Sequence, residues 1–500
     1  MPADTTDPLT VRPPVRPSLR RRVGAVLAPA VFVLLLALPM GALPPRAHHL
    51  AAVLGAVVVL WITEALPLPV TALLGAAVCV VLQVAPAKEV FAPFADPLMF
   101  LFIGAFILSR AIFLHGLDRR VAYAVLSLPW VGARPSRILL AFGAVTAFIS
   151  WWISNTATTA MMFGIGLSIL AALRAPGANT TIDPRYATAL MLMTSFAASV
   201  GGLATPVGTP PNLIGLGFIR SQIGVEIPFF RWMLIGVPIV LVLFAFLYAY
   251  LNAVAPAGVR ELPAGAELIR RERARLGPWT RGQRSVAIAF LLTVALWILP
   301  GVVAIVAGEG SPLYMSLARR LPEGVAALVG SLLLFILPGD EGAAITWQEA
   351  VQIDWGVILL YGGGFALGVL SFQTGLAEAM GRGLTRLLPI EGSLGMLVAS
   401  VLVAVILSET TSNTAAANMV VPVVISIAHA AGFDPLEPAL GATMAASLGF
   451  MLPVSTPCNA IVYGSGYIPL SRMIRHGLAL DLAGIVVIVT MVRLLSPLLR

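Results

Sequence analysis

The chain has 500 residues, of which 59% are hydrophobic and 11% are charged, and its mean hydropathy is +0.95. This composition excludes a soluble globular domain and indicates an all-α, polytopic membrane protein. The formal net charge of +8 lies in short connections between apolar segments, which is typical of cytoplasmic loops and not of a nucleic-acid-binding face. Cys79 and Cys458 have neither disulfide nor metal-ligand spacing.

In chain order, residues 1–22 predict a disordered cytoplasmic tail, because they are rich in proline and arginine and lack periodicity. Eleven apolar segments then predict membrane crossings. They cover residues 23–43, 48–65, 68–85, 97–127, 186–222, 230–254, 284–307, 322–338, 355–388, 436–468 and 477–498. The long polar connection 255–283 predicts a cytoplasmic linker with a short surface helix. The distribution of basic residues places the N-terminus in the cytoplasm and the C-terminus outside the inner (plasma) membrane.

Two further apolar segments, 136–174 and 392–431, each contain a polar tripeptide near the middle. It is Ser154-Asn155-Thr156 in the first segment and Ser412-Asn413-Thr414 in the second. A spanning helix needs about 20 apolar residues, and the arms beside each tripeptide are shorter, so each segment predicts a re-entrant hairpin with the tripeptide at its tip. Irregular backbone at membrane depth is tolerated where it lines a cavity. We therefore expect both tips to form a binding site.

The tripeptide belongs to a longer internal repeat. Asp96, Gly104 and Ser154 recur 258 residues later as Asp354, Gly362 and Ser412, and residues 206–210 recur 247 residues later as residues 453–457. If each repeat holds five crossings, an odd number, the second must be inverted relative to the first, which is typical of secondary transporters. The predicted domains are the first helix and first repeat (23–254), the linker (255–283) and the second repeat (284–500).

Each repeat also contains a span that prolines interrupt. Pro206, Pro210 and Pro211 break the span 186–222, and Pro453 and Pro457 break the span 436–468. Backbone carbonyls freed at such breaks favour Na⁺, and helix N-termini favour anions. The sequence therefore predicts four sets of polar groups around one site, two from the hairpin tips and two from the breaks.

Neither lysine nor arginine occurs in the apolar stretches around these groups, 138–173, 187–218, 394–431 and 441–470. From this we expect a bound dianion to meet no side-chain cation. Each helix N-terminus stabilises an anion by only about 0.3–2 kcal/mol, which is less than the cost of removing two charges from water. A mobile cation must then supply the charge. Neutral hydroxyl and carbonyl oxygens favour Na⁺ over a transition metal, so uptake is predicted to depend on sodium.

These motifs resemble those of the divalent anion:sodium symporters, which carry dicarboxylates, citrate or sulfate. The resemblance rests on both tripeptides, on the residue runs 208–212 and 455–459, and on residues 61–67. It implies a homodimer that works by an elevator motion, with sodium ions as co-transported ligands at two or more sites. The implied sodium ligands are Ser150, Ser154, Asn155, Gly208, Ser408, Thr411, Asn413 and Ser455. The implied substrate-binding residues are Asn155, Thr156, Thr209, Pro210, Asn413, Thr414, Thr456 and Pro457. Cys458 departs from the family pattern, which has proline there.

Other polar residues in the apolar segments are weaker candidates. Glu409 is an intramembrane acid near the second tip, where it either takes part in transport or holds the tip in place. Glu64 and Arg110 favour structural or interfacial roles. His115 and His429 are expected at the membrane interface, and Asp96 and Asp354 are expected to cap the spans that follow them.

Together these features predict a secondary active transporter that couples inward sodium movement to uptake of a small divalent anion, such as the C4-dicarboxylate succinate. The alternatives are a sodium-independent dicarboxylate exchanger, a sulfate or citrate transporter of the same fold, and an anion channel. An enzyme is not expected, because no HExxH or GxSxG motif occurs, and the absence of GxxxxGK[ST] argues against an ATP-driven pump.

Overall fold

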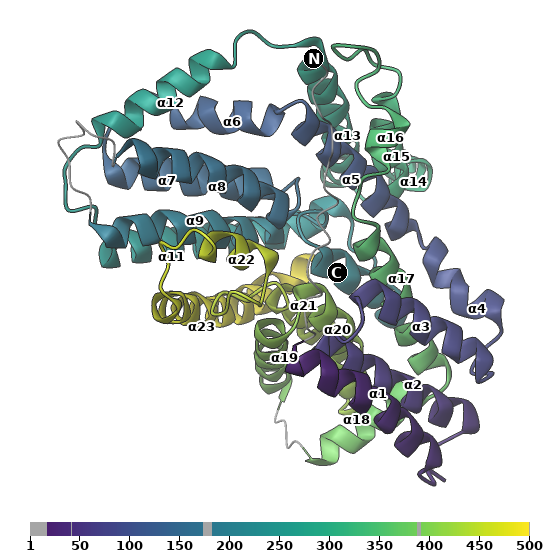
Figure 1. Cartoon of the computed structure of the whole chain (residues 1–500). Helices are drawn as coiled ribbons and strands as arrows, with labels where there is room; N and C mark the ends of the chain where they lie inside the picture. The colour runs from purple at the N-terminus through teal and green to yellow at the C-terminus, as the bar shows by residue number, and fades with distance from the viewer. Residues whose placement is uncertain (1–17, 42, 174–182, 388–391, 500) are drawn as a thin grey trace, which may run out of the picture.

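The computed structural model describes residues 18–41, 43–173, 183–387 and 392–499, and within them it is helical, with no β-strand beyond one isolated bridge. Figure 1 shows the helices in space. The first half contains α1 (Leu19–Ala37), α2 (Pro45–Thr63), α3 (Leu68–Val81), α4 (Ala87–Phe91), α5 (Pro97–Leu114), α6 (Leu117–Leu126), α7 (Pro135–Ser150), α8 (Asn155–Ala172), α9 (Pro184–Gly201), α10 (Pro210–Phe218) and α11 (Phe229–Val254).

After the linker helix α12 (Pro263–Arg275), the second half repeats this series with additions. It contains α13 (Arg281–Ala307), α14 (Pro312–Arg320), α15 (Glu323–Leu333), α16 (Trp347–Ala350), α17 (Trp355–Gln373), α18 (Leu376–Leu387), α19 (Gly392–Thr410), α20 (Asn413–Ala430), α21 (Leu436–Ala445), α22 (Pro457–Tyr463) and α23 (Leu470–Leu495). Ten helices of the described residues are long and apolar enough to cross a membrane, and α8, α19 and α20 of the hairpins are among them.

The two segments predicted as hairpins each contain a pair of helices in contact, α7 with α8 and α19 with α20. The predicted tail ends too late. Ser18 caps α1 by accepting a hydrogen bond from Arg21 N (3.4 Å), so the helix already begins at Leu19. The rest of the predicted tail, residues 1–17, lies outside the described residues.

Two predicted spans, 97–127 and 355–388, are wrong as single crossings. Each divides at a glycine in the left-handed region, Gly116 (φ 63°) and Gly375 (φ 80°), which ends one helix and starts a shorter one. The shorter helices α6 and α18 carry charged residues, such as Asp118 on α6 and Glu378 on α18. The same division at equivalent places in both halves supports the internal repeat.

The linker helix α12 is confirmed, and it packs against α6 and α8 (Figure 1). Glutamates and arginines at i, i+3 and i, i+4 on its exposed face pair with one another, for example Glu267 with Arg271 at 2.9 Å. The helices α14 and α16 were not predicted.

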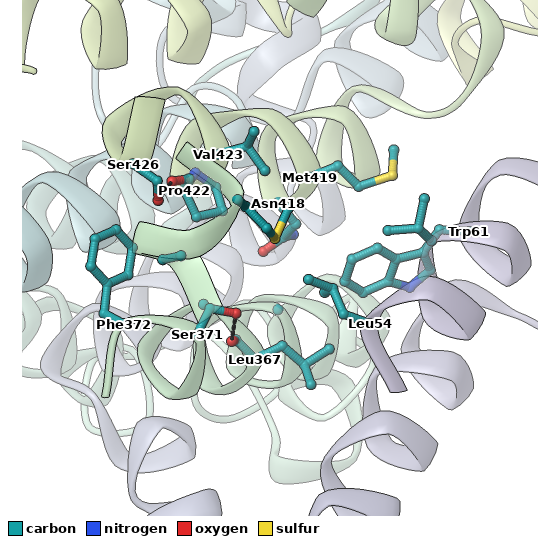
Figure 2. A pocket seen from close by; sticks show the side chains of 15 residues that line it. Leu54, Trp61, Leu367, Ser371, Phe372, Asn418, Met419, Pro422, Val423 and Ser426 are labelled. Atoms are coloured by element: carbon teal, nitrogen blue, oxygen red, sulfur yellow. Dashed lines mark hydrogen bonds between the residues drawn. The ribbon is translucent and has the colours of Figure 1, made fainter. Parts of the chain in front are cut away.

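A small apolar crevice of about 90 Å³ separates the second hairpin from earlier helices. Side chains of α2, α17, α18 and α20 line it, and Figure 2 shows Trp61 of α2 on one side, with Asn418 of α20 and Leu367 of α17 on facing helices. The contact between these helices is therefore incompletely filled.

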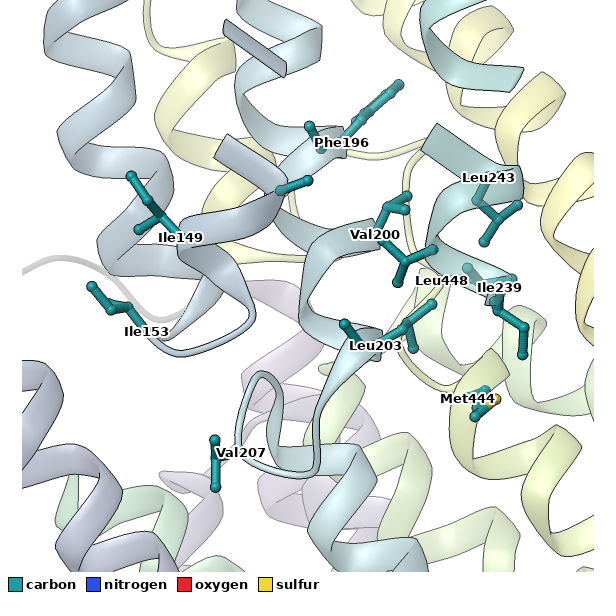
Figure 3. Close-up of a cluster of buried hydrophobic side chains, with 14 of the residues drawn as sticks. Ile149, Ile153, Phe196, Val200, Leu203, Val207, Ile239, Leu243, Met444 and Leu448 are labelled. Carbon is teal, nitrogen blue, oxygen red and sulfur yellow. The ribbon is translucent and has the colours of Figure 1, made fainter. Parts of the chain in front are cut away.

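The packing core of the first half surrounds α9, which is buried from Tyr186 to Gly201 between α7, α8, α11 and α22. Figure 3 shows apolar side chains from five segments meeting beside the break that follows α9. They include Ile149, Ile153, Phe196, Val200, Leu203, Val207, Ile239, Leu243, Met444 and Leu448. This packing holds the non-helical segment in a fixed position.

Candidate transport site

The two hairpin tips have the same local structure. Ser154 caps α8, where its Oγ accepts from Ala157 N (3.3 Å), and Ser412 caps α20, where its Oγ accepts from Ala415 N (3.2 Å). A serine at this position satisfies one of the free N–H groups of a helix start. Each tip therefore places a capped helix N-terminus, a weak positive dipole end, inside the protein.

The breaks of the two interrupted spans are also equivalent. The Nδ2 of Asn212 donates to Gly202 O (3.0 Å) and Thr205 O (2.8 Å). The Nδ2 of Asn459 donates to Gly449 O (2.9 Å) and Leu452 O (3.0 Å). In both halves one buried asparagine thus bridges two carbonyls that no helix satisfies, and this brace fixes the extended segment before α10 and α22.

The tips and breaks meet at one cavity of about 850 Å³. All eight predicted substrate-binding residues line it, namely Asn155, Thr156, Thr209, Pro210, Asn413, Thr414, Thr456 and Pro457. Equivalent residues of the two halves, which lie 258 positions apart at the tips and 247 positions apart at the breaks, are thereby brought together. Cys458 also lines the cavity, and it occupies the second position of α22 as Pro211 does in α10, so its departure from the repeat leaves the helix start unchanged.

The predicted sodium ligands divide into two groups. Ser154, Asn155, Asn413 and Ser455 line the cavity, whereas Ser150, Gly208, Ser408 and Thr411 do not. Two members of the second group contact asparagines of the first. Ser150 Oγ lies 2.7 Å from the Asn155 amide, and Ser408 Oγ donates to Asn413 Oδ1 (2.8 Å).

The surroundings of the Asn155 amide suit a cation. The amide atom beside Ser150 Oγ also lies 3.1 Å from Ala198 O and 3.3 Å from Gly208 O. If this atom is Nδ2, it donates to all three oxygens. If it is Oδ1, four oxygens face one another with one hydroxyl proton between them, and a hard cation such as Na⁺ would bind there.

The expectation that a bound dianion meets no side-chain cation is wrong in part. The apolar stretches around the tips contain no lysine or arginine, but Arg110 of α5 lines the cavity. It also forms no ion pair within the described residues, since its guanidinium donates to the amide oxygen of Gln352 (2.5 Å). From the sequence, Arg110 is expected in a structural or interfacial role, because the tip and α5 are separated in the chain and only the packing brings them together.

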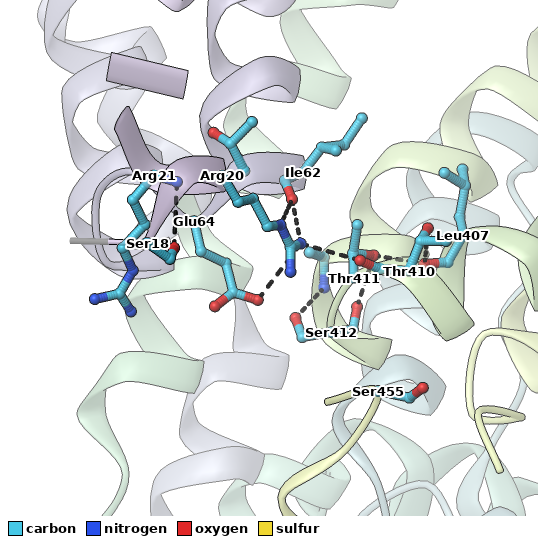
Figure 4. A network of polar contacts seen from close by, with 12 residues as sticks. Ser18, Arg20, Arg21, Ile62, Glu64, Leu407, Thr410, Thr411, Ser412 and Ser455 are labelled. Carbon is cyan, nitrogen blue, oxygen red and sulfur yellow. Dashed lines mark hydrogen bonds and ion pairs between the residues drawn. The ribbon is translucent and has the colours of Figure 1, made fainter. Parts of the chain in front are cut away.

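Glu409 does not line the cavity and acts as a brace within the described structure. Its carboxylate accepts from Met451 N (2.7 Å) and from Ser455 Oγ (2.6 Å), which ties the end of α19 to the second break. Glu64 is held structurally as well, 3.8 Å from Arg20. Arg20 also donates to Ile62 O (2.9 Å) and Thr410 O (3.0 Å), so it joins α1 and α2 to the second hairpin (Figure 4).

The predicted caps are confirmed, since Asp96 accepts from Leu98 N (2.9 Å) and Asp354 accepts from Val357 N (3.2 Å). Asp96 additionally pairs with Arg220. A ring nitrogen of His115 lies 2.7 Å from Ala344 O. The His115 contact connects the two halves, and Asp354 lies at the wall of the cavity.

Asp481 on α23 is a buried acid that the sequence reasoning missed. It is 2% exposed, neither carboxyl oxygen has a hydrogen-bond partner within the described residues, and its neighbour is Glu409. Two adjacent buried carboxyls are costly. We expect Asp481→Asn to stabilise the protein by about 1–3 kcal/mol, because Nδ2 can donate to Glu409.

Thermal unfolding in detergent, followed by tryptophan fluorescence, measures this effect. Glu226→Gln removes an exposed acid and serves as the control, for which the unfolding temperature should not change. A lower unfolding temperature for Asp481→Asn would show that the carboxyl is stabilising.

Comparison with known proteins gives the family. The family model described as "Sodium:sulfate symporter transmembrane region" matches residues 19–499. The chain belongs to the sodium:sulfate symporter family. It is 35% identical over 484 residues to the sodium-dependent dicarboxylate transporter SdcS of Staphylococcus saprophyticus, covering 95% of this chain and 91% of that protein. It is 34% identical to SdcS of Staphylococcus aureus strain USA300, with the same coverage.

Solved structures support the helical membrane fold of this family member. The YdaH transporter of Alcanivorax borkumensis superposes with a TM-score of 0.55 at 13% identity, over 96% of this chain and 98% of that one. MtrF of Neisseria gonorrhoeae superposes with a TM-score of 0.52 at 12% identity, over 84% and 85% of the two chains. At such identities the likeness concerns the fold alone.

Proposed function

We propose that this protein is a secondary active transporter that couples inward sodium movement to the uptake of a C4-dicarboxylate such as succinate. The observation that carries the proposal is the cavity between the two tips and the two breaks. It combines two capped helix N-termini, which favour carboxylates, with neutral oxygens, which favour Na⁺. Membership of the family and the similarity to SdcS support the same coupling.

In this proposal one sodium ion binds at the first tip and a second binds at the second tip. The first site uses Ser150, Ser154, Asn155 and Gly208, and the second uses Ser408, Thr411, Asn413 and Ser455. The Oδ1 of each asparagine faces the ion and its NH₂ group faces the substrate, since one amide can do both. Arg110 offsets at most one of the two substrate charges, so sodium is still needed for the remainder.

The proposal includes the arrangement of the working protein. The two repeats are inverted, the protein is a homodimer, and the hairpins with the breaks move as an elevator against the early spans of each half. The N-terminus lies in the cytoplasm and the C-terminus outside. The matching tips, braces and divided spans of the two halves support the repeat on which this arrangement depends.

Uptake into liposomes tests the proposal. Purified protein is reconstituted, and accumulation of labelled succinate, citrate and sulfate is measured under an imposed inward gradient of Na⁺, K⁺ or choline at fixed pH. We expect saturable succinate accumulation with Na⁺ and none with K⁺ or choline.

Other outcomes favour other functions. Equal accumulation without sodium would indicate a proton-coupled carrier, and uptake only against internal dicarboxylate would indicate an exchanger. Flux without saturation or counterflow would indicate a channel, and a preference for sulfate or citrate would correct the substrate.

A further inference from the structure

Arg110 is the one basic side chain among the cavity-lining residues of the described structure. It lies near the end of α5, an early span, whereas the predicted sodium ligands belong to the hairpins and breaks. Its side chain is half-buried. The Nε atom is shielded from solvent and has no hydrogen-bond partner within the described residues.

No neighbouring carboxylate forms an ion pair with this guanidinium within the described residues, although Arg110 contributes, after the hydrogen bonds from Thr346, to the lowered pKa of Glu349. Glu349 is occupied by Thr346, from which it accepts both backbone N–H (2.9 Å) and hydroxyl (2.8 Å) hydrogen bonds. Asp354, the acidic residue that lines the cavity, caps α17 through Val357 N. In the described part of the chain, Arg110 has the neutral Gln352 amide as its side-chain partner.

A guanidinium at the wall of a cavity in a membrane protein is costly without a counter-ion. Its planar donor set suits a carboxylate, with which it can form two parallel hydrogen bonds. Because Nε is shielded and Nη2 is bound to Gln352, Nη1 is the guanidinium nitrogen left for such a ligand. A dicarboxylate in the cavity supplies the missing anion.

Resting on the proposed function, we propose that Arg110 is a specificity-determining residue that recognises the second carboxylate of the substrate and selects a dianion over a monoanion. Gln352 positions it. Because the sodium sites are made by other elements, the charge of Arg110 acts on substrate recognition and leaves the sodium sites intact.

The experiment compares wild-type protein with Arg110→Gln and Arg110→Lys in the liposome assay. For Arg110→Gln we expect KM for succinate to rise about tenfold or more, since one of the positive charges facing the dianion is lost. The KM of Arg110→Lys should lie between those of wild type and Arg110→Gln, because lysine keeps the positive charge but lacks the planar pair of donors of a guanidinium. Inhibition by succinate and by monomethyl succinate should differ less in Arg110→Gln than in wild type.

Two controls separate recognition from folding. Arg284→Gln removes an exposed arginine outside the cavity and should leave KM unchanged. Gln352→Leu keeps the Arg110 charge but removes the hydrogen bond that positions the guanidinium. It should raise KM less than Arg110→Gln does. In every variant the sodium concentration for half-maximal uptake should match wild type.

The outcomes are distinguishable. An Arg110→Gln protein with wild-type KM and wild-type preference for succinate over the monoester would overturn the assignment of Arg110 while leaving the proposed function in place. If Arg110→Gln fails to fold, an Arg110→Lys protein with wild-type recognition and an unchanged KM in Gln352→Leu would overturn it. Wild-type protein that does not transport dicarboxylate would overturn both.

Discussion

Asn413→Asp is expected to abolish dicarboxylate uptake in a protein that still folds and still binds sodium. Asn413 lies at the second tip, lines the cavity and accepts from Ser408 Oγ at 2.8 Å. The substitution keeps an oxygen for sodium but replaces the amide N–H donor by a negative charge. Two unit charges 4 Å apart at an effective dielectric near 20 repel by about 4 kcal/mol, which is about a thousandfold in affinity.

Two measurements check this expectation. Sodium should still raise the unfolding temperature of Asn413→Asp, whereas added succinate should not. Asn155→Asp should behave alike, because the first tip has the same local structure. Asn252→Asp makes the same chemical change at an exposed position and serves as control. Normal dicarboxylate transport by Asn413→Asp would show that the amide does not contact the substrate.

The parts of the site that could be predicted from sequence are those with local causes. A serine before a helix caps it, and prolines spaced closely within an apolar span break it, so the tips and breaks follow from residues near each other in the chain. The duplication of both features indicated that they act together. In the structure, all of the predicted substrate-binding residues line one cavity.

The parts that could not be predicted depend on packing between distant segments. The side chain of Arg110 reaches the cavity only because α5 lies beside it, and Asp481 meets Glu409 only because α23 packs on α19. The division of two spans had a local signal that hydropathy alone concealed. Gly116 and Gly375 each follow a long apolar helix and precede a charged segment, which is typical of a helix end.

A disulfide between the second hairpin and an early span is expected to stop turnover and to leave substrate binding intact. The elevator proposal requires α20 to move past α17, and these helices are in contact at Gly364 and Asn418. A Cβ placed on Gly364 lies 3.2 Å from the Cβ of Asn418, close to the separation of about 3.5–4.5 Å that a disulfide spans. Figure 2 shows Asn418 facing this contact beside the apolar crevice.

The double variant Gly364→Cys/Asn418→Cys is assayed in oxidised and reduced forms. We expect no succinate uptake after oxidation and recovery after reduction, because a bond across the moving contact fixes one of the two states that alternating access requires. Sodium and succinate should still raise the unfolding temperature of the oxidised protein, since no cavity-lining residue is changed. The single variant Asn418→Cys should transport in both conditions and is the matched control, because a Cβ on Gly364 lies 2.0 Å from Asn418 Oδ1 when the asparagine is kept. If mass spectrometry shows complete cross-linking and uptake continues at the wild-type rate, then α20 does not move relative to α17, and the hairpin belongs to the fixed part of the protein.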